Sequence, residues 1–254
     1  GETIEVGVDN AGATENLLKA ALEKARKLLT HVDDGGTSGN DYTRVGFYRQ
    51  NEVAALLTAY NEAFAIYNGN LTASYLTAYE ALNSAYTDVM ANSHAQVTLL
   101  PGSACVLANY AYSERYMAED ASGDVITNTQ SGGVNPSTVP ANGQWIFEEA
   151  GEANVYYLKN ANSGQYAQAL KRSTVLKTGS TPVGYTLHTI GTGLFSLRYN
   201  GAANNTLHSA ASVSYKVVGW DDNEDPSQWY ITMVSKDEVT ELRQELAALA
   251  EKTQ

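Results

Sequence analysis

Hydrophobic residues in the first ninety positions recur with the spacing of an amphipathic helix in three segments. The first segment runs from Thr14, the second opens near Asn51, and the third is predicted to be capped by Thr72. The apolar stripes consist of Leu18, Leu22, Ala25 and Leu29, then Val53, Leu57, Tyr60, Phe64 and Tyr67, and finally Tyr75, Tyr79, Leu82, Tyr86 and Val89. Each stripe leaves water only by facing the other two, which predicts a three-helix bundle over residues 1–95. The tyrosines are then core residues, with a row of sugar-stacking rings as the alternative.

After about residue 97 the chain becomes rich in Gly, Ser, Thr, Asn, Val and Tyr, and it repeats itself. The pairs Gln144-Trp145 and Gln228-Trp229 lie 84 residues apart, and the strand-like stretch at Tyr185 lies about halfway between them. Each repeat of roughly 40 residues holds about four short strands, which favours a closed barrel with pseudo-threefold symmetry. Residues 96–234 are therefore predicted to form a β-trefoil, with both tryptophans in its core.

The last segment, residues 235–254, is predicted to be a C-terminal amphipathic helix. Ser235 and Glu238 have the spacing of a capping box, and the helix would carry Val239, Leu242, Leu246 and Leu249 on one side. It either folds back onto the bundle or links to a further domain. The predicted fold class is thus multidomain, α followed by all-β.

Charge narrows the range of partners. The chain has 28 acidic and 16 basic residues, a formal net charge of -12, and no local cluster of Lys and Arg. This balance argues against nucleic acid and anionic membrane surfaces as partners. No apolar run is long enough for a transmembrane segment, and Cys105 stands alone in an apolar run as an expected buried thiol. The composition and the initial Gly suggest part of a longer secreted, periplasmic or cell-surface bacterial protein.

Two resemblances to known families add to this picture. The loop Val45-Gly46-Phe47-Tyr48 and the helix after it resemble FIVAR-type bundles of bacterial surface and glycan-processing proteins, which implies a spacer or accessory interaction role. The stretch from Tyr157 to Tyr166, with the two Gln-Trp strands, resembles ricin-B-like lectins attached to secreted glycan-degrading proteins of gut bacteria. That resemblance implies carbohydrate binding. The sequence departs from the ricin pattern, because Gly143 and Ser227 stand where Gln is expected and the sugar-ligating Asp has no clear counterpart.

The candidate carbohydrate site lies in the third repeat. Sugars are held by an aromatic face and by carboxylates or amides that take hydrogen bonds from hydroxyls. The residues that supply these groups are Trp220, Asp221, Asp222, Asn204, Asn205 and His208. Alternatively, Trp220 caps the barrel or packs on the bundle. The acidic residues at 221–225 have the alternate spacing of a calcium loop, but they lack its Gly and its final Glu.

No catalytic signature is present. The chain has no nucleophile elbow, P-loop, H-E-x-x-H or dinucleotide fingerprint, and its four histidines are scattered. No cofactor or metal is predicted, although a Ser/His/Asp triad could still assemble in space. Three functions remain open: a non-catalytic glycan-binding or adhesion module, a structural spacer or protein-docking unit, and a protease-inhibitor trefoil that acts through the long loop at residues 131–142.

Overall fold

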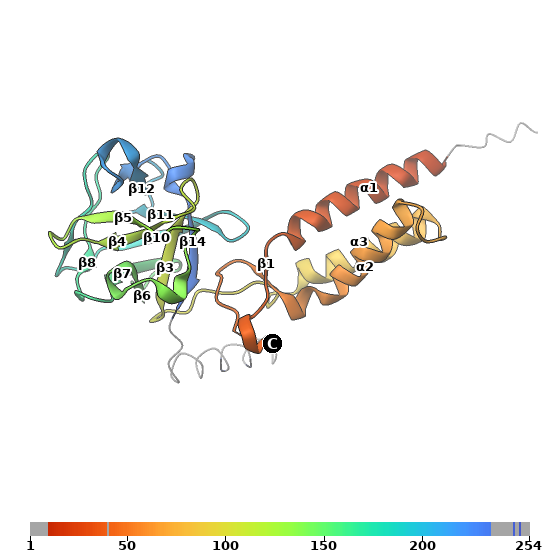
Figure 1. The fold of residues 1–254 in the computed structure, drawn as a ribbon, viewed down its shortest axis with the longest axis horizontal. Coiled ribbons are helices and arrows are strands. Elements are labelled where there is room, and N and C mark those ends of the chain that lie inside the picture. Colours follow the sequence, from red (N-terminus) through yellow and green to blue (C-terminus); the bar gives the residue numbers. More distant parts are fainter. Residues whose placement is uncertain (1–9, 40, 235–245, 247–248, 250–254) are drawn as a thin grey trace, which may run out of the picture. The chain divides into compact units, whose positions relative to one another are not determined.

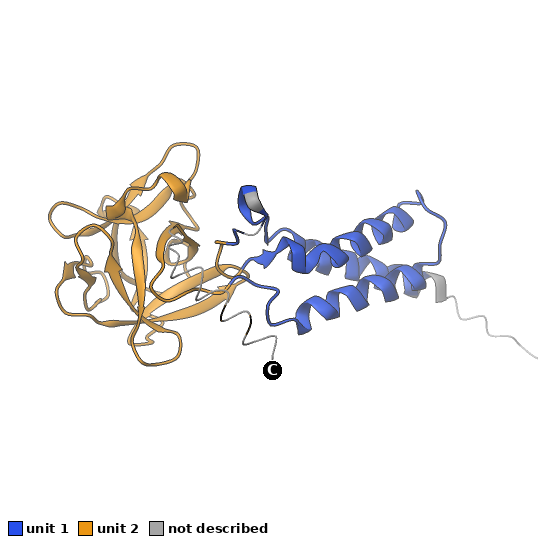
Figure 2. Ribbon diagram, turned by 90° about the horizontal axis from the view of Figure 1, so that it is seen from below, with its two compact units in different colours: residues 1–42, 47–97 blue, residues 43–46, 98–254 orange. Residues whose placement is uncertain are grey.

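The computed structural model describes residues 10–39 and 41–234, together with residues 246 and 249. The chain divides into two compact units, of which the first holds residues 1–42 and 47–97 and the second holds residues 43–46 and 98–254 (Figure 2). Each unit has its own sheet or core and is described separately. The predicted capping box at Ser235 lies outside the described residues.

The first unit contains the three predicted helices, α1 (Asn10–Leu29), α2 (Ala54–Tyr67) and α3 (Tyr75–Ala91) (Figure 1). Leu18, Leu56 and Leu82, one from each helix, are fully buried in a shared core. All five tyrosines of the predicted stripes pack against this core. Leu57 and Phe64 of the second predicted stripe do not, because they are 43% and 47% exposed, and Leu56 and Ala63 are buried in their place. Two short parallel strands, β1 (Val32–Asp33) and β2 (Tyr48–Arg49), and two 3-10 turns, Gly36–Ser38 and Gln50–Val53, complete the unit.

The start of α3 differs from the prediction. Ser74, and not Thr72, is the N-cap, because its Oγ accepts a hydrogen bond of 3.1 Å from the backbone N–H of Thr77. A cap must lie directly before the first helical residue for its side chain to reach the free amides of the first turn. Thr72 lies too far upstream, and the Thr-Ala-Ser sequence offered two hydroxyls between which periodicity alone could not choose.

In its described residues, 43–46 and 98–234, the second unit has twelve strands in three groups of four. The first group is β3 (Ala104–Asn109), β4 (Arg115–Glu119), β5 (Val125–Thr129) and β6 (Trp145–Glu149). The second is β7 (Val155–Asn160), β8 (Tyr166–Ala167), β9 (Thr178–Gly179) and β10 (Gly184–Gly191). The third is β11 (Leu194–Tyr199), β12 (Thr206–Ala210), β13 (Lys216–Trp220) and β14 (Trp229–Met233).

Strand pairing closes these groups into a barrel. The first and last strands of each group form an antiparallel ring in the order β3, β6, β7, β10, β11, β14 and back to β3. The middle strands form three hairpins, β4–β5, β8–β9 and β12–β13. Isolated bridges and the β13–β5 pairing connect the hairpins to one another. A six-stranded barrel with three hairpins is the β-trefoil arrangement that the sequence repeats predict.

The barrel core repeats one hydrogen bond three times. Trp145, Tyr185 and Trp229 stand at the start of β6, β10 and β14 and are fully buried. Their polar atoms donate to backbone carbonyls in the hairpin of the same repeat, over 3.0 Å to Met117, 2.6 Å to Gln168 and 2.8 Å to Leu207 respectively. A buried aromatic side chain with a polar atom needs such a partner. Tyr185 therefore replaces the missing tryptophan of the second repeat, and burial raises its pKa.

The three hairpins also share a charged contact. Asp124, from the first repeat, accepts hydrogen bonds from Lys177 of the second and from Lys216 of the third, the latter over 2.5 Å. Only 10% of the Asp124 side chain is exposed. Hydrogen bonds from the two lysines, with the larger effect from Lys177, hold the pKa of Asp124 below its ordinary value. This carboxylate therefore links all three repeats.

Residues 43–46 belong to the trefoil although they precede it by fifty residues. The N–H of Val45 donates to the carbonyl of Ile231 (3.0 Å), and the N–H of Met233 donates to the carbonyl of Thr43 (2.9 Å). Arg44 thereby forms an antiparallel bridge with Thr232 on β14. Gly46 follows with a φ of +78°, and a Cβ there would lie 2.9 Å from the Cα of Gly193. The chain thus leaves the helical unit, makes one β-bridge to β14 of the barrel, and returns.

Candidate functional site

The candidate site is built on the hairpin of the third repeat. β12 and β13 pair with Thr206 opposite Trp220 and His208 opposite Val218. Trp220 is the last residue of β13 and is half-buried, so its ring lies where the strand runs out into the loop that holds Asp221 and Asp222. Figure 1 shows β12 at the edge of the trefoil.

Arg172 holds Trp220 from a neighbouring repeat. It lies between β8 and β9, where it bridges Gly219, and the N–H of Ser173 donates to the carbonyl of Gly219 over 2.8 Å. The guanidinium carbon lies 4.2 Å from the centroid of the Trp220 ring. A cation placed above the face of an indole ring is attracted to it electrostatically. One side of the indole is therefore covered by protein.

The same guanidinium binds Asp221 in a bidentate pair. Nη1 and Nη2 of Arg172 donate to Oδ1 and Oδ2 of Asp221 over 2.7 and 2.8 Å. These hydrogen bonds lower the pKa of Asp221 and raise that of Arg172. Because 38% of the Asp221 side chain remains exposed, its outer lone pairs stay accessible.

Asp222 has a different environment. Its Oδ2 accepts from Nε of Arg198 over 2.7 Å and from Nη2 of the same side chain, and only 14% of its side chain is exposed. Its backbone N–H donates to the carbonyl of Ala203 over 2.9 Å. These contacts anchor the loop, and they leave little of the Asp222 carboxylate accessible to a ligand.

His208 is oriented by a short chain of hydrogen bonds. The hydroxyl of Ser227 donates to the carbonyl of Asp221 over 2.6 Å, so its oxygen is an acceptor toward Nδ1 of His208 at 2.8 Å. This assigns the proton to Nδ1 and leaves Nε2 as an acceptor when the ring is neutral. Burial lowers the pKa of His208, and the nearby Asp221 partly offsets this. The ring centroid lies 5.9 Å from that of Trp220.

The two asparagines lie on the loop that leads into β12. The backbone N–H of Asn205 donates to Ala202 over 3.0 Å, and its carbonyl accepts from Tyr199 over 2.9 Å. Asn204 is exposed and Asn205 is half-buried. Since Thr206 lies opposite Trp220, both asparagines are within two residues of the position facing the indole.

Three residues of this site were not predicted from the sequence: Arg172, Arg198 and Ser227. The arginines lie in other parts of the trefoil, and nothing in their local pattern marks them. Ser227 did carry a signal, because it stands where the ricin pattern has Gln. The structure gives that departure a role, since the hydroxyl orients His208.

No protein-family model matches the chain, and no curated protein matches it significantly. Solved structures that match include a Polyporus squamosus lectin bound to a human-type influenza-binding epitope (20% identity, 55% of this chain and 51% of that chain, TM-score 0.45). They also include the Rhizoctonia solani agglutinin (19%, 54% and 99%, 0.44). A third is a Macrolepiota procera ricin B-like lectin in complex with lactose (16%, 53% and 98%, 0.43). The chain spans about half the length of the Polyporus lectin. The trefoil assignment stands on the strand pairing itself.

Among the helices that the structure describes, none combines the length and the apolar character needed to cross a lipid bilayer.

Proposed function

We propose that the trefoil is a non-catalytic carbohydrate-binding module of a larger secreted bacterial protein, and that the β12–β13 hairpin carries its sugar site. The observation that supports this most directly is the half-buried Trp220 beside the partly exposed carboxylate of Asp221. An aromatic ring covers the apolar CH face of a sugar, and a fixed carboxylate accepts hydrogen bonds from adjacent hydroxyls.

Each residue has a chemical role in this proposal. Trp220 supplies the stacking surface on the part of the indole that Arg172 leaves open. Asp221 and Nε2 of neutral His208 accept hydrogen bonds, and the amides of Asn204 and Asn205 both donate and accept. Asp222 is a positioning residue that acts through Arg198.

The same geometry argues for binding without hydrolysis. Glycoside hydrolysis needs a carboxylic acid that is protonated near neutral pH, which requires a raised pKa. Asp221 is shifted the other way, because the hydrogen bonds from Arg172 stabilise its ionised form. It is therefore suited to hold hydroxyl groups and unsuited to protonate a leaving group.

A glycan array, followed by affinity electrophoresis of the full chain, tests this function. The native protein is expected to bind at least one glycan, and Trp220→Ala is expected to abolish that binding. Tyr110→Ala is the matched control, because Tyr110 is an exposed aromatic residue of the same trefoil at the end of β3. Absence of binding to every host and dietary glycan would refute the function. Loss of binding in both variants, or in neither, would refute the site.

The protease-inhibitor alternative finds less support. Residues 131–142 do not form an extended loop, because the segment contains the 3-10 turn Pro136–Thr138 and leads into a second, Ala141–Gly143. The side chain of Gln130 donates to Thr138 and accepts from the N–H of Asn135, and the side chain of Asn135 accepts from the hydroxyl of Ser137. Val139 is 3% exposed and packs with Tyr116 in the trefoil. A loop tied down in this way presents little free backbone to a protease.

A further inference from the structure

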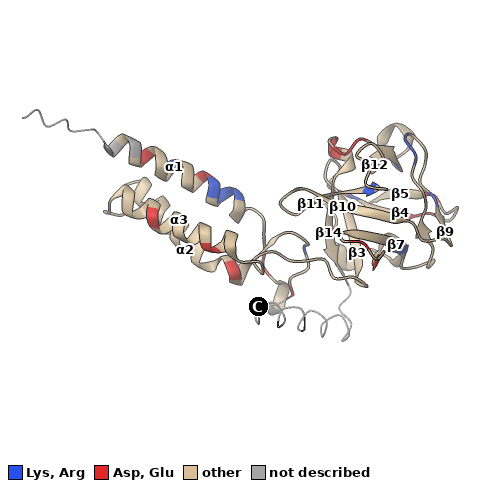
Figure 3. Ribbon diagram, turned by 180° about the vertical axis from the view of Figure 1, so that it is seen from behind, with Lys and Arg blue, Asp and Glu red and all other residues tan. Residues whose placement is uncertain are grey.

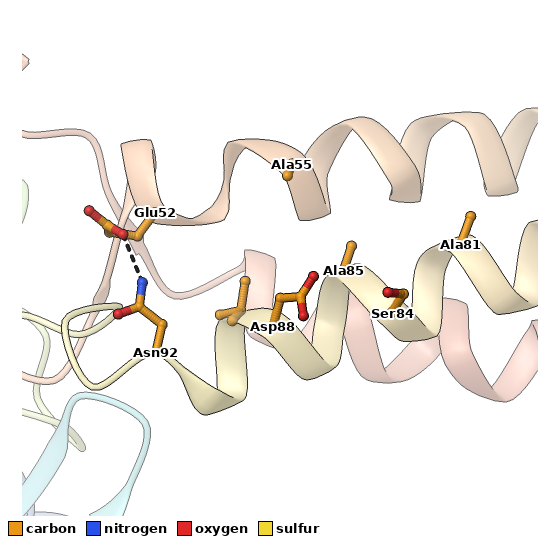
Figure 4. A pocket seen from close by; sticks show the side chains of 8 residues that line it. Glu52, Ala55, Ala81, Ser84, Ala85, Asp88 and Asn92 are labelled. Atoms are coloured by element: carbon orange, nitrogen blue, oxygen red, sulfur yellow. Dashed lines mark hydrogen bonds between the residues drawn. The ribbon is translucent and has the colours of Figure 1, made fainter.

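The helical unit has an open groove on the surface of α2 and α3. It encloses about 380 Å³ and is lined by Glu52, Ala55, Ala81, Ser84, Ala85, Asp88, Val89 and Asn92 (Figure 4). At one end, Nδ2 of Asn92 donates to Oε2 of Glu52 over 2.8 Å and joins α3 to the turn before α2. The floor of the groove borders the shared core, to which Val89 belongs and against which Ala85 packs, while Ala81, Ser84 and Asp88 are exposed along it.

The lining of α3 follows one helical stripe. Its positions 81, 84, 85, 88, 89 and 92 are separated by three or four residues, the spacing of a face that packs against another helix. The stripe extends over about three turns, roughly 16 Å. Its alanines and Ser84 have short side chains, so a helix seated in the groove can approach α2 and α3 closely. Ser84 and Ala81 are exposed, which leaves this face open in the described part of the chain.

The charge of the groove has a single sign. Between Gln50 and Glu114 the sequence contains no Lys or Arg, whereas Glu52, Glu62, Glu80 and Asp88 lie on or beside the two helices. Figure 3 shows acidic but no basic positions on α2 and α3, whereas α1 carries both kinds. Within the residues that the structure describes, neither Glu52 nor Asp88 forms an ion pair.

We propose that this groove binds a basic amphipathic helix of a partner protein, one that carries a stripe of small residues flanked by Lys or Arg. Small side chains on both surfaces permit close packing, and the flanking cations meet Glu52 and Asp88. Two copies of this chain that met groove to groove would place acidic residues against each other, which opposes self-association through this face. The proposal is independent of sugar binding, which concerns the trefoil.

Fluorescence anisotropy with the full chain tests the proposal. The probe is a labelled helical peptide of about 16 residues, the length of the groove and one further turn, with an Ala stripe and flanking Lys residues. The comparison peptide carries Glu at every Lys position. The Lys peptide is expected to bind at least roughly tenfold more tightly, and to lose affinity as salt screens the charges.

Two substitutions locate the binding. Asp88→Lys reverses the charge in the groove, and Ser84→Trp fills it at an exposed position that the helix core does not use. Both are expected to abolish peptide binding with unchanged helical circular dichroism. Glu80→Lys is the charge-matched control, because Glu80 lies on α3 outside the lining, and it is expected to retain binding.

Several results would overturn the proposal. These are equal affinity for the two peptides, no binding of the Lys peptide at about 1 mM, or equal losses in Glu80→Lys and Asp88→Lys. Sedimentation that shows a dimer of the native chain and a monomer of Ser84→Trp would assign the groove to a second copy instead.

Discussion

Arg172 and Trp220 belong to different repeats of the trefoil, and the guanidinium of the first lies 4.2 Å from the ring of the second. The same arginine holds both oxygens of Asp221, so one side chain fixes the aromatic and the acidic half of the candidate site. Lysine cannot reproduce this arrangement, because it has neither a planar surface nor a forked set of donors.

The first prediction concerns that arginine. Arg172→Lys is expected to lower glycan affinity by roughly tenfold or more, because Trp220 and Asp221 lose their common orientation. Stability should change little, since both partners of the pair are more than a third exposed. Affinity electrophoresis and urea unfolding measure the two effects. An Arg172→Lys variant with native affinity would show that the arginine does not organise the site.

His208 makes glycan binding dependent on pH. Burial lowers its pKa in the folded protein, so the ring is neutral at pH 7 and Nε2 can accept a hydrogen bond. Protonation turns that acceptor into a donor, so affinity is expected to fall as the pH drops through the lowered pKa of His208, which lies below the ordinary histidine value of about 6.5. His208→Gln should bind more weakly and lack this dependence. Isothermal titration between pH 5 and 8, about the range in which histidine titrates, checks both, and equal pH profiles would contradict the assignment.

Asp124 makes the stability of the trefoil sensitive to acid. Its pKa is lower in the folded than in the unfolded chain, because Lys177 and Lys216 stabilise the carboxylate. Its contribution is therefore complete above the unfolded pKa of about 4 and is lost as the pH falls through the lower folded value. The stability difference between native protein and Asp124→Asn should shrink below about pH 4.

Urea unfolding at a series of pH values measures that difference. Glu152→Gln, an exposed substitution in the turn between β6 and β7, is the control and should show no comparable effect. A gap between native protein and Asp124→Asn that stays constant on acidification would mean that the carboxylate stabilises the trefoil by packing and not by its charge.

The contact that residues 43–46 make with the trefoil can be tested at its glycine. Gly46 and Gly132 both have positive φ, +78° and +85°, but an added Cβ meets backbone only at Gly46. Ala at either position carries the left-handed backbone penalty of about 1–2 kcal/mol. Gly46→Ala should cost distinctly more, because Gly193 cannot move aside freely. Chemical denaturation of the two variants gives the comparison, and equal losses would show that the close approach is not a constraint.

The sequence allowed the barrel to be predicted because its signals are local and repeated. Trp145 and Trp229 mark equivalent strands in the first and third repeats. The alternation around Tyr185 identified the corresponding strand of the second repeat even without a tryptophan. The candidate site was only partly predictable. Trp220, Asp221 and His208 do come together, but the ion pairs of Arg172 and Arg198 join loops from different repeats, and such contacts leave no periodic trace. The contact between Arg198 and Asp222 was likewise not predictable, and it is the reason why we assign Asp222 a positioning role in the proposed site.

Residues 43–46 have a practical consequence for any attempt to transplant the trefoil. A fragment cut at residue 98 would keep the twelve described strands and still lack residues 43–46, of which Thr43 and Val45 bond to Met233 and Ile231. The bared stretch of β14 would offer unpaired amides and carbonyls to other chains. Gene fusion or shuffling therefore cannot move the trefoil intact at its obvious boundary, and a graft must carry residues 43–46 to keep this edge of β14 paired.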